Sequence, residues 1–394
     1  MRKGFAEKLE TITIKSADFF LLVLVLALVF FGLAMVFSAS YYTSISESDN
    51  PFKYLLKDGL WVFIGLILMG IGMMVDYHAY ANKFWAIGAV IVCFLLLITV
   101  LTPVGTNLNG AQRWIYLGPI SIMPGELAKL GLIFFISWFY GKRPIRAHRL
   151  FSGLLPVFGL MLLFAALIIK QPNLSTAITV CGIVVCMQLV AGMHWGYVGF
   201  LAAMGGAGFA GLLTFASDSY WMTRLTSFLD PFADAAGDGY QVVQSLYALG
   251  SGGLFGVGIG KSVQKSLYLP EPQNDFILAI IGEELGFIGV LVLLLAYCLF
   301  IWRGARIAVK VPDQFGLLLA SGIVLMVAIQ VILNVAVVTS SMPPTGINLP
   351  FVSYGGNALL IFMGSMGVML NISRHSTAPL KKPEEEEDIP RREV

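Results

Sequence analysis

Charged residues are scarce in this sequence. Asp, Glu, Lys and Arg together make up 12% of its 394 residues, whereas 57% are hydrophobic. A soluble domain normally carries about 25% charged residues, so the chain has too few charges to coat a water-facing globule. Its formal net charge of +2 also gives no reason to expect nucleic acid as a partner. The composition therefore indicates an integral membrane protein.

Cysteine is rare as well. The four cysteines lie inside apolar runs, which argues against a disulfide framework and against a thiolate metal site. They are expected to be buried thiols that behave as small hydrophobic side chains. These residues are Cys93, Cys181, Cys186 and Cys298.

What the sequence has in abundance is long apolar runs. Each is close to the roughly 20 residues that a bilayer-spanning helix needs. A lipid-exposed backbone has to satisfy its own hydrogen bonds, so every run is predicted to be a helix and the fold all-α. The first run follows a long polar segment and is interpreted as a retained span, not a cleaved signal peptide. The ten predicted spans are 19–37, 59–75, 85–101, 125–140, 154–169, 176–191, 197–215, 276–302, 315–338 and 357–371.

The distribution of Lys and Arg predicts the orientation of this ten-helix membrane domain, residues 19–372. With both termini in the cytoplasm, 17 of the 25 basic residues fall on the cytoplasmic side and seven outside, as the positive-inside rule requires. Residues 1–18 then form a cytoplasmic N-terminus and residues 373–394 a cytoplasmic tail. The tail contains an acidic run, 384–388, and is expected to be disordered and solvated.

One external connection is too long to be a simple link. Residues 217–275 join the seventh and eighth spans, whereas most connections have about 4–6 residues. The segment contains enough aromatic residues to pack. It also contains a glycine-dense stretch, 250–260, where the backbone has to bend tightly or approach another segment closely. A loop of this length is typically functional.

The candidate catalytic residue is Asp275, where this loop reaches the eighth span. All four histidines (His78, His148, His194 and His375) fall in predicted cytoplasmic segments, so proton abstraction outside is left to a carboxylate. Pro270 and Pro272 stiffen the approach. A carboxylate at the mouth of a span is partly desolvated, which suits a general base. The alternative is that Asp275 only caps the helix that follows it.

Other ionisable residues lie inside the predicted spans, where charges are costly and are usually paired or functional. Glu283 and Glu284 are expected about 12 Å deeper than Asp275 and on different faces of the same helix, so at least one is predicted to have a structural partner. Glu126 and Lys129 are three residues apart and share one face of the fourth span. They are interpreted as an internal salt bridge, with a pair lining a polar cavity as the alternative.

External cations are the candidates for holding a phosphate-bearing substrate. They are Arg113, Lys170, Arg224, Lys261 and Lys265. The last external loop, 343–356, carries no charge. Its prolines and glycines predict a rigid lip or a backbone lining for a cavity.

Taken in order along the chain, these motifs resemble the SEDS family (shape, elongation, division and sporulation proteins), which includes FtsW, RodA and SpoVE. The segments that carry the resemblance span nearly the whole chain. They are 109–114 (NGAQRW), 123–130 (MPGELAKL), 170–177 (KQPNLSTA), 240–241 (YQ), 251–256 (SGGLFG), 269–276, 282–286 (GEELG) and 345–356. The runs 264–272 and 343–346 are more similar to the FtsW/SpoVE branch than to RodA. Asn173 departs from the aspartate that the family usually carries at that position.

The resemblance implies a peptidoglycan glycosyltransferase that polymerises lipid II, an undecaprenyl-pyrophosphate disaccharide-pentapeptide, into β-1,4 glycan strands. It implies that Asp275 is essential and that Glu126 and Lys129 form the family's pair in a central cavity. The candidate substrate-binding residues are Arg113, Arg224, Gln241, Lys261, Lys265 and Ser353. The resemblance further implies a class B penicillin-binding protein and other divisome proteins as partners, in the bacterial cytoplasmic membrane at the division septum.

Two other interpretations stay open. A transporter that moves lipid II between leaflets without chemistry would also suit ten spans with buried charges, although its polar groups should follow the whole crossing path. A scaffold for division proteins would need no acid at position 275. No cofactor is required by the motifs, but a divalent cation, Mg²⁺ or Mn²⁺, could offset the charge of a pyrophosphate. The choice among division, sporulation and elongation is not fixed by the sequence.

Overall fold

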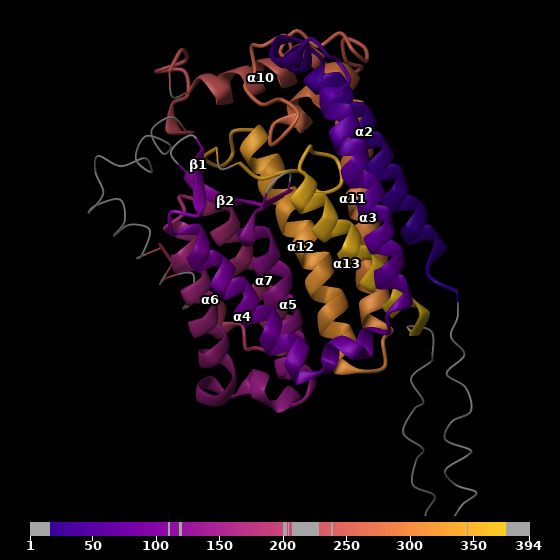
Figure 1. Ribbon diagram of the computed structural model, residues 1–394, viewed down its shortest axis with the longest axis vertical. Helices are drawn as coiled ribbons and strands as arrows, with labels where there is room; N and C mark the ends of the chain where they lie inside the picture. The colour runs from indigo at the N-terminus through magenta and orange to yellow at the C-terminus, as the bar shows by residue number, and fades with distance from the viewer. Residues whose placement is uncertain are drawn as a thin grey trace, which may run out of the picture.

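The computed structural model describes residues 16–108, 111–117, 120–199, 203, 205–206, 228–237, 239–344 and 346–375. Long helices lie side by side in a bundle (Figure 1). The first described helix begins and the last one ends at the lower end of the bundle in Figure 1, which we call the terminal end. The strands and helix α10 lie at the opposite end, which we call the loop end.

The predicted spans are helical wherever the structure describes them. Their helices are α2 (Phe19–Ser48), α3 (Lys53–Met74), α4 (Lys83–Val100), α5 (Pro124–Gly141), α6 (Leu155–Ile169), α7 (Leu174–Val190), α11 (Ile277–Val309), α12 (Gln314–Val338) and α13 (Gly356–His375). Within the described residues, seven of the helices are long and apolar enough to cross a membrane, and α5 and α7 are shorter or more polar. The seventh predicted span lies largely outside the described residues, as does the tail beyond residue 375.

Short polar side chains fix where several helices begin. Asp18 accepts a hydrogen bond from the backbone N–H of Leu21, at 2.9 Å, at the start of α2. Asn173 accepts one from Thr176 at 3.3 Å at the start of α7. Such caps each contribute about 1 kcal/mol. The family's usual aspartate at position 173 is therefore replaced here by a residue that still caps its helix.

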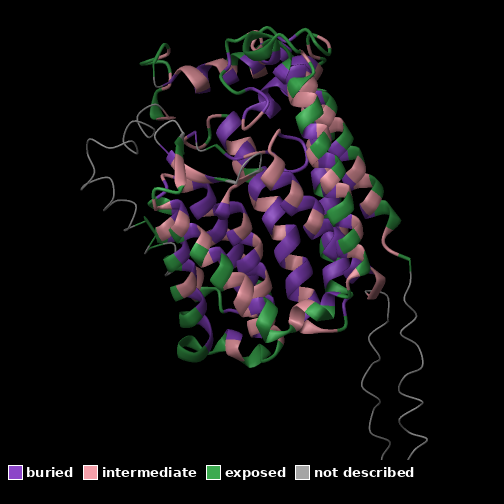
Figure 2. Ribbon diagram, in the orientation of Figure 1, coloured by how far each residue is buried: buried purple, intermediate pink, exposed green. Residues whose placement is uncertain are grey.

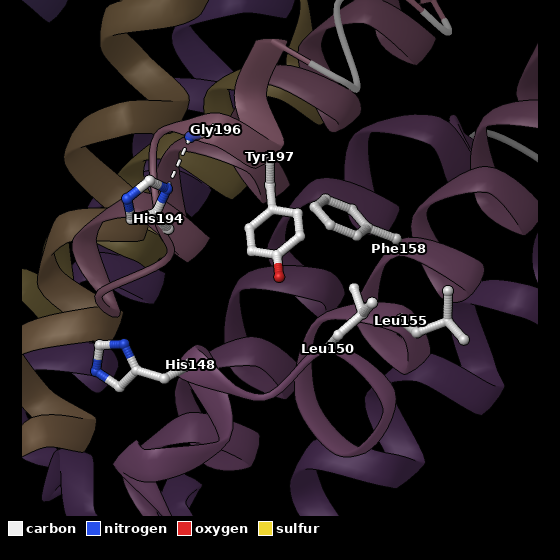
Figure 3. Close-up of a pocket in the computed structure, with 7 residues that line it drawn as sticks. All are labelled: His148, Leu150, Leu155, Phe158, His194, Gly196 and Tyr197. Atoms are coloured by element: carbon white, nitrogen blue, oxygen red, sulfur yellow. Dashed lines mark hydrogen bonds between the residues drawn. The ribbon is translucent and has the colours of Figure 1, made fainter.

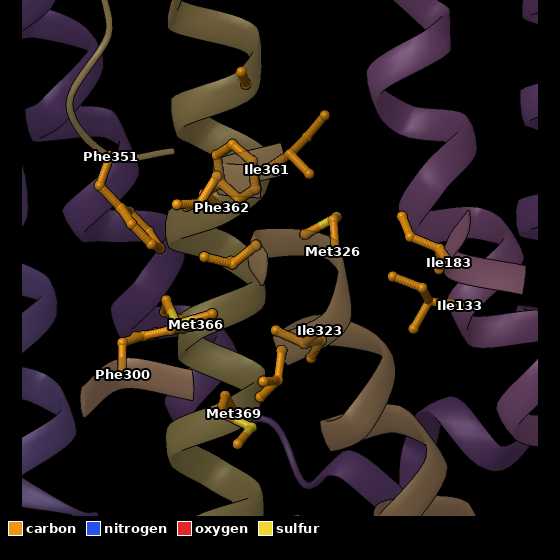
Figure 4. Close-up of a cluster of buried hydrophobic side chains, with 14 of the residues drawn as sticks. Ile133, Ile183, Phe300, Ile323, Met326, Phe351, Ile361, Phe362, Met366 and Met369 are labelled. Atoms are coloured by element: carbon orange, nitrogen blue, oxygen red, sulfur yellow. The ribbon is translucent and has the colours of Figure 1, made fainter. Parts of the chain in front are cut away.

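The centre of the bundle is apolar. Phenylalanine, isoleucine and methionine side chains of α12, α13 and their neighbours fill it (Figure 4). Buried residues gather on these central helices, whereas α4 and the other outer helices expose apolar side chains (Figure 2). Small residues bring α3 and α13 into close contact, because a Cβ on Gly367 would stand only 2.3 Å from the backbone oxygen of Met69.

Helix α11 is not the continuous helix that the sequence predicted. Gly286 has φ 68° and ψ −171°, so the helix is broken there into a short segment that carries Glu283 and Glu284 and a long segment that follows. The free backbone groups at the break meet a loop: the N–H groups of Phe287 and Ile288 donate to the carbonyl oxygens of Gly253 and Leu254, at 2.9 and 3.1 Å. A broken helix at membrane depth requires such partners.

The loop end contains structure that the sequence did not predict. Between α4 and α5 the chain forms a three-stranded antiparallel sheet in the order β1 (Gly105–Leu108), β2 (Ala111–Leu117), β3 (Ile120–Ile122). The long external segment contains the helix α10 (Tyr240–Gly252), whose Val242, Val243 and Ala248 are buried. The prediction that this segment packs is therefore confirmed for its described part. Short helical turns complete the chain: η2 (Tyr77–Ala81), η3 (Pro144–His148) and η4 (Leu150–Leu154).

Candidate active site

A polar crevice opens at the loop end, between the last loop and strand β2. It has an inner compartment of about 130 Å³ and an outer one of about 240 Å³. Trp114, Asn348, Gly355 and Asn357 line both compartments, so the two adjoin. The inner one is also lined by Arg113, Met123, Glu126, Thr176, Thr179, Gln330, Gly346, Ile347 and Ala358, and the outer one by Lys57, Trp61, Tyr116, Ser121, Asn274, Tyr354 and Gly356. The prediction that the last loop lines a cavity is confirmed.

Asp275 lies next to residues that line this crevice. A Cβ added to Gly346, which lines the inner compartment, would stand 3.7 Å from Oδ2 of Asp275. Its neighbour Asn274 lines the outer compartment. Asp275 is half-buried, and the N-cap position of α11 falls on Phe276. Asp275 thus stands one residue before the N-cap position, and its carboxylate lies beside Gly346 of the inner compartment.

Asn334 ties Asp275 to the last loop. The fully buried side-chain amide of Asn334, on α12, donates to the backbone oxygen of Asp275 at 2.8 Å and to that of Ile347 at 2.7 Å. Nearby, the backbone N–H of Tyr354 donates to the backbone oxygen of Gln273 at 2.9 Å. The two chain segments that flank the crevice are thus held in one register by three hydrogen bonds.

Glycines let the last loop close on its neighbours. A Cβ on Gly355 would stand 2.2 Å from Nδ2 of Asn348, and one on Gly356 would stand 2.5 Å from the indole ring of Trp61. The Asn348 amide is the end of a flexible side chain and could shift, whereas the Trp61 ring is rigid. Gly356 is therefore the glycine that lets Trp61 pack against the last loop.

Two cations line the crevice. Arg113, on β2, donates through Nε to the backbone oxygen of Gln171 at 3.3 Å and through a terminal nitrogen to that of Pro172. Lys57, in the first turns of α3, is exposed and lines the outer compartment. The crevice therefore presents positive charge on two sides, on a backbone-held arginine and on an exposed lysine.

Glu126 and Lys129 form the predicted ion pair. Nζ of Lys129 lies 2.6 Å from Oε2 of Glu126, and the lysine is 1% exposed. Glu126 also lines the inner compartment. Both interpretations of the sequence therefore hold, because the pair is an internal salt bridge and one member reaches the crevice.

Comparison with known proteins gives the family. The model of the FtsW/RodA/SpoVE cell cycle proteins matches residues 19–378. Stage V sporulation protein E of Bacillus subtilis is 42% identical over 362 residues, which cover 92% of this chain and 98% of that protein. The chain belongs to this SEDS family. The resemblance found in the motifs is confirmed.

Other SEDS relatives agree in sequence and in fold. The probable peptidoglycan glycosyltransferase FtsW of Bacillus subtilis is 37% identical over 368 residues, 91% of each chain. A chain solved in a study of a peptidoglycan synthase complex has a TM-score of 0.75 at 29% identity, over 92% of this chain and 99% of that one. Rod shape determining protein RodA of Thermus thermophilus has a TM-score of 0.66 at 29% identity, over 92% and 98%. This SEDS chain thus has the fold of RodA.

Lys265 is a correction to the predicted phosphate-binding cations. Its Nζ lies 2.7 Å from Oε1 of Glu284 and 2.9 Å from Oγ of Ser38, and the lysine is 2% exposed. An ammonium buried in an ion pair cannot also hold a substrate phosphate. The structural partner that was predicted for at least one of the two glutamates is Lys265, and Glu284 is the residue it pairs with.

Glu283 and the glycine-dense stretch, 250–260, also connect the long external loop to α11. The Glu283 carboxylate accepts hydrogen bonds from Ser262 and from the backbone N–H of Val263, the latter at 2.8 Å. Four glycines from 253 to 260 have positive φ, and a Cβ on Gly256 would stand 2.2 Å from the backbone oxygen of Glu284. The predicted close approach of this stretch to another segment is confirmed.

Of the remaining candidate substrate residues that the structure describes, none lines the crevice. Ser353 is buried, and its hydroxyl accepts a hydrogen bond from the backbone N–H of Leu349 at 2.8 Å, so its role is inside the loop, a second correction. Gln241 lies at the start of α10, and Lys261 is exposed on the long loop. Arg224 lies outside the described residues.

Sequence reasoning missed several crevice residues. Lys57 was counted only among the seven basic residues outside and was not named as a candidate, and Asn348 was only part of the uncharged loop 343–356. Trp61 carried no signal, because a tryptophan in an apolar run is ordinary. Lys57 stands four residues before Trp61, one helical turn away, and this spacing is the signal that could have found the pair.

The pKa values of Tyr354 and Glu271, at and near the outer compartment, are shifted by their surroundings. Burial, together with the nearby carboxyls of Asp58, Glu271 and Glu47, raises the pKa of Tyr354, so it remains a neutral phenol. Burial and the charge of Glu47 raise the pKa of Glu271, although a hydrogen bond from Asn274 opposes this. Three carboxyl groups thus lie close enough to Tyr354, which lines the outer compartment, to affect its pKa.

Histidines lie away from the crevice. His148 and His194 face a separate apolar cavity of about 700 Å³, together with Leu150, Phe158 and Tyr197 (Figure 3). His148 follows α5, which begins near the sheet at the loop end, so this cavity lies toward the terminal end. A carboxylate is thus the titratable base that the described crevice offers.

Proposed function

We propose that this chain is a peptidoglycan glycosyltransferase that polymerises lipid II in the crevice, with Asp275 as general base. The observation that carries the proposal is the placement of the Asp275 carboxylate beside Gly346, which lines the inner compartment of a polar crevice, with the backbone oxygen of Asp275 held by Asn334. The relatives named as probable peptidoglycan glycosyltransferases support the reaction class. The cell-wall synthesis it serves is septal or sporulation synthesis, like that of its FtsW and SpoVE relatives.

The proposed membrane arrangement has ten spans with both termini in the cytoplasm. It rests on the excess of Lys and Arg that this orientation places inside. The crevice then opens on the outer face of the bacterial cytoplasmic membrane. Lipid II can reach it there with its undecaprenyl chain still in the bilayer.

The proposed reaction is a single displacement. Asp275 accepts the proton of the 4-hydroxyl of the acceptor sugar as that oxygen attacks the anomeric carbon of the donor. The bond from this carbon to the pyrophosphate oxygen breaks as the new C–O bond forms, and undecaprenyl pyrophosphate leaves with the electron pair. Attack from the face opposite the leaving group inverts the carbon and gives a β-1,4 linkage.

Arg113 and Lys57 are the proposed partners of the pyrophosphate. Both line the crevice, whereas Lys265 is committed to Glu284. Positive groups fixed where negative charge develops lower the barrier to departure of the leaving group. Arg113 is held by two backbone carbonyl oxygens, so its guanidinium has little freedom to lose on binding.

The sequence left open whether a divalent cation acts as a cofactor. In the part of the chain that the structure describes, no group of three His, Cys, Asp or Glu side chains could hold a metal ion. These residues do not fit a resident metal, and no step above uses one. Any Mg²⁺ or Mn²⁺ requirement is proposed to come from the substrate's own pyrophosphate.

A class B penicillin-binding protein is the proposed partner, together with other divisome proteins. Support comes from the similar chain solved in a study of a peptidoglycan synthase complex that couples polymerisation and crosslinking. The division septum is the proposed location.

A lipid II transporter is the competing function, and one experiment separates the two. Purified protein, with and without its partner, is incubated with fluorescent lipid II in liposomes, and both glycan strands and leaflet exchange are measured. The proposal expects strands on a gel. Leaflet exchange without strands, under conditions where the partner is present, would establish the transporter instead.

A further inference from the structure

A second polar cavity lies at the terminal end, remote from the crevice. It has a volume of about 350 Å³ and lies where α2 begins and where α11 and α13 end. Asp18, Phe20, Arg303, Arg306, Lys310 and Ser373 are among the residues that line it. None of them takes part in the reaction proposed above.

The charge of this cavity is positive. Arg303 is neutralised by Asp18, since its Nη2 lies 2.7 Å from Oδ2 of that residue. Arg306 and Lys310 are exposed, and no described carboxylate pairs with either. Three cationic side chains against one acidic side chain leave a net charge of +2 around the cavity. Such a site favours an anion.

Aromatic side chains place the cavity at the depth of lipid headgroups. Phe19 and Phe20 are 75% and 47% exposed at the first residues of α2, and Trp302 is 47% exposed on α11. The Arg306 guanidinium lies over the Trp302 ring, 4.1 Å from its centroid. An exposed tryptophan near the end of an apolar helix is typical of the membrane–water interface, whereas the exposed phenylalanines offer apolar surface. The apolar surface next to the cations is thus positioned for acyl chains.

We propose that this cavity binds the headgroup of an anionic phospholipid in the leaflet at the terminal end. Arg306 and Lys310 contact the phosphate, and the acyl chains lie against Phe19 and Phe20. A free phosphate ion carries the same kind of charge but has no acyl chains to contact the aromatic surface. We therefore favour a phospholipid over free phosphate as the ligand. The simpler account, that these cations only orient the chain in the membrane, requires no cavity.

The test compares two double variants of the purified full chain in neutral phosphatidylcholine nanodiscs. Arg306→Gln/Lys310→Gln removes the cations of the cavity. Lys142→Gln/Arg143→Gln is the matched control, because it removes two exposed cations at the end of α5, one of which also lies over a tryptophan, 5.6 Å from the ring centroid of Trp138. Phosphatidylglycerol is titrated in, and thermal stabilisation and native mass spectrometry report binding.

We expect the cavity variant to bind phosphatidylglycerol roughly 10- to 30-fold more weakly than wild type, because each cation near a headgroup contributes about 1 kcal/mol. The control variant should bind as wild type does. If phosphatidylglycerol binding weakened equally in both variants, the effect would come from the total positive charge of the protein, and the proposed site would be wrong. Unchanged binding by the cavity variant would also overturn it. If inorganic phosphate alone reproduces the full stabilisation, the lipid assignment is wrong.

Discussion

Asn334 is the single residue on which the geometry around Asp275 depends most. Its side chain bridges the backbone oxygens of Asp275 and Ile347 from inside the bundle. The side chain is fully buried on α12, and Gln330, one helical turn earlier, lines the inner compartment. In the proposed mechanism Asn334 is therefore a positioning residue, which acts on the reaction through Asp275.

Asn334→Leu should lower polymerase activity by about 10- to 100-fold, because a misplaced reactive group loses rate steeply. It should also cost about 1–3 kcal/mol of stability, since two buried carbonyl groups lose their partners. Asn371→Leu is the control: Asn371 is buried at the terminal end, where it donates to the backbone oxygen of Met73 and accepts from the backbone N–H of Tyr77. It should lose similar stability but keep its activity, and a parallel loss of activity in both would contradict the positioning role.

Glu271 gives a pH-dependent prediction. Its pKa in the folded protein lies above that of the unfolded chain, because burial and the charge of Glu47 disfavour the carboxylate. The folded state therefore holds the proton more tightly, and stability from this residue is present at low pH and is lost as pH rises through the raised pKa. Glu271→Gln should melt at a higher temperature than wild type at pH 7, and the difference should shrink below pH 4.5. A difference independent of pH would contradict this.

At the scale of elements, the long external loop is fastened to α11 and α2 by a buried ion pair. Lys265 and Glu284 share it, with Ser38 of α2 as a third member. The loop continues from this point to Asp275. The ion pair at Lys265 thus limits where Asp275 can lie.

Breaking the ion pair should be costly. Lys265→Met or Glu284→Gln alone should destabilise the protein by about 3–5 kcal/mol, because the remaining charge or dipole is left buried, whereas Lys265→Met/Glu284→Leu should recover most of the loss. The exposed pair Lys53 and Glu47, at 2.7 Å, is the control, and Lys53→Met should change stability by about 1 kcal/mol or less. Thermal unfolding in detergent measures each variant. Additive losses in the double variant would show that the two residues do not act as a pair.

The break in α11 depends on glycine. Gly286→Ala should cost about 1–3 kcal/mol for its positive φ alone, and more for a Cβ only 2.3 Å from the backbone nitrogen of Gly256. Gly364→Ala, in α13, meets no atom within 4 Å and should stabilise its helix by about 0.5–1 kcal/mol. Opposite signs of the change in melting temperature are expected. A Gly286→Ala variant as stable as wild type would argue for a continuous helix.

At the scale of the whole molecule, periodic and compositional signals were predictive and long-range contacts were not. The described spans begin within six residues of their predicted starts, as with α3 at Lys53 against residue 59, because bilayer thickness and apolar composition act locally. The break at Gly286 was missed, since it exists only because residues 253–258 supply its hydrogen bonds. The small sheet was missed because its strands are only three to seven residues long.

In the candidate site, too, local features could be predicted from the sequence and long-range contacts could not. Asp275 and the Glu126–Lys129 pair were predictable, because an acid at the mouth of a span and two charges on one helix face are local features. Lys265 was misassigned because its partner Glu284 comes from the far side of a folded loop. The contribution of Lys57 and Asn348 to one crevice arises only when α3 and the last loop pack together.

The central claim is that one external carboxylate removes the proton from the incoming sugar. Its most direct test is the rate of glycan formation from lipid II by Asp275→Asn, measured beside lipid II binding and thermal stability. Asparagine keeps the size of the side chain and the backbone oxygen that Asn334 contacts. The account predicts normal binding and melting with a rate about 10²- to 10⁴-fold lower. A rate within about twofold of wild type would contradict it.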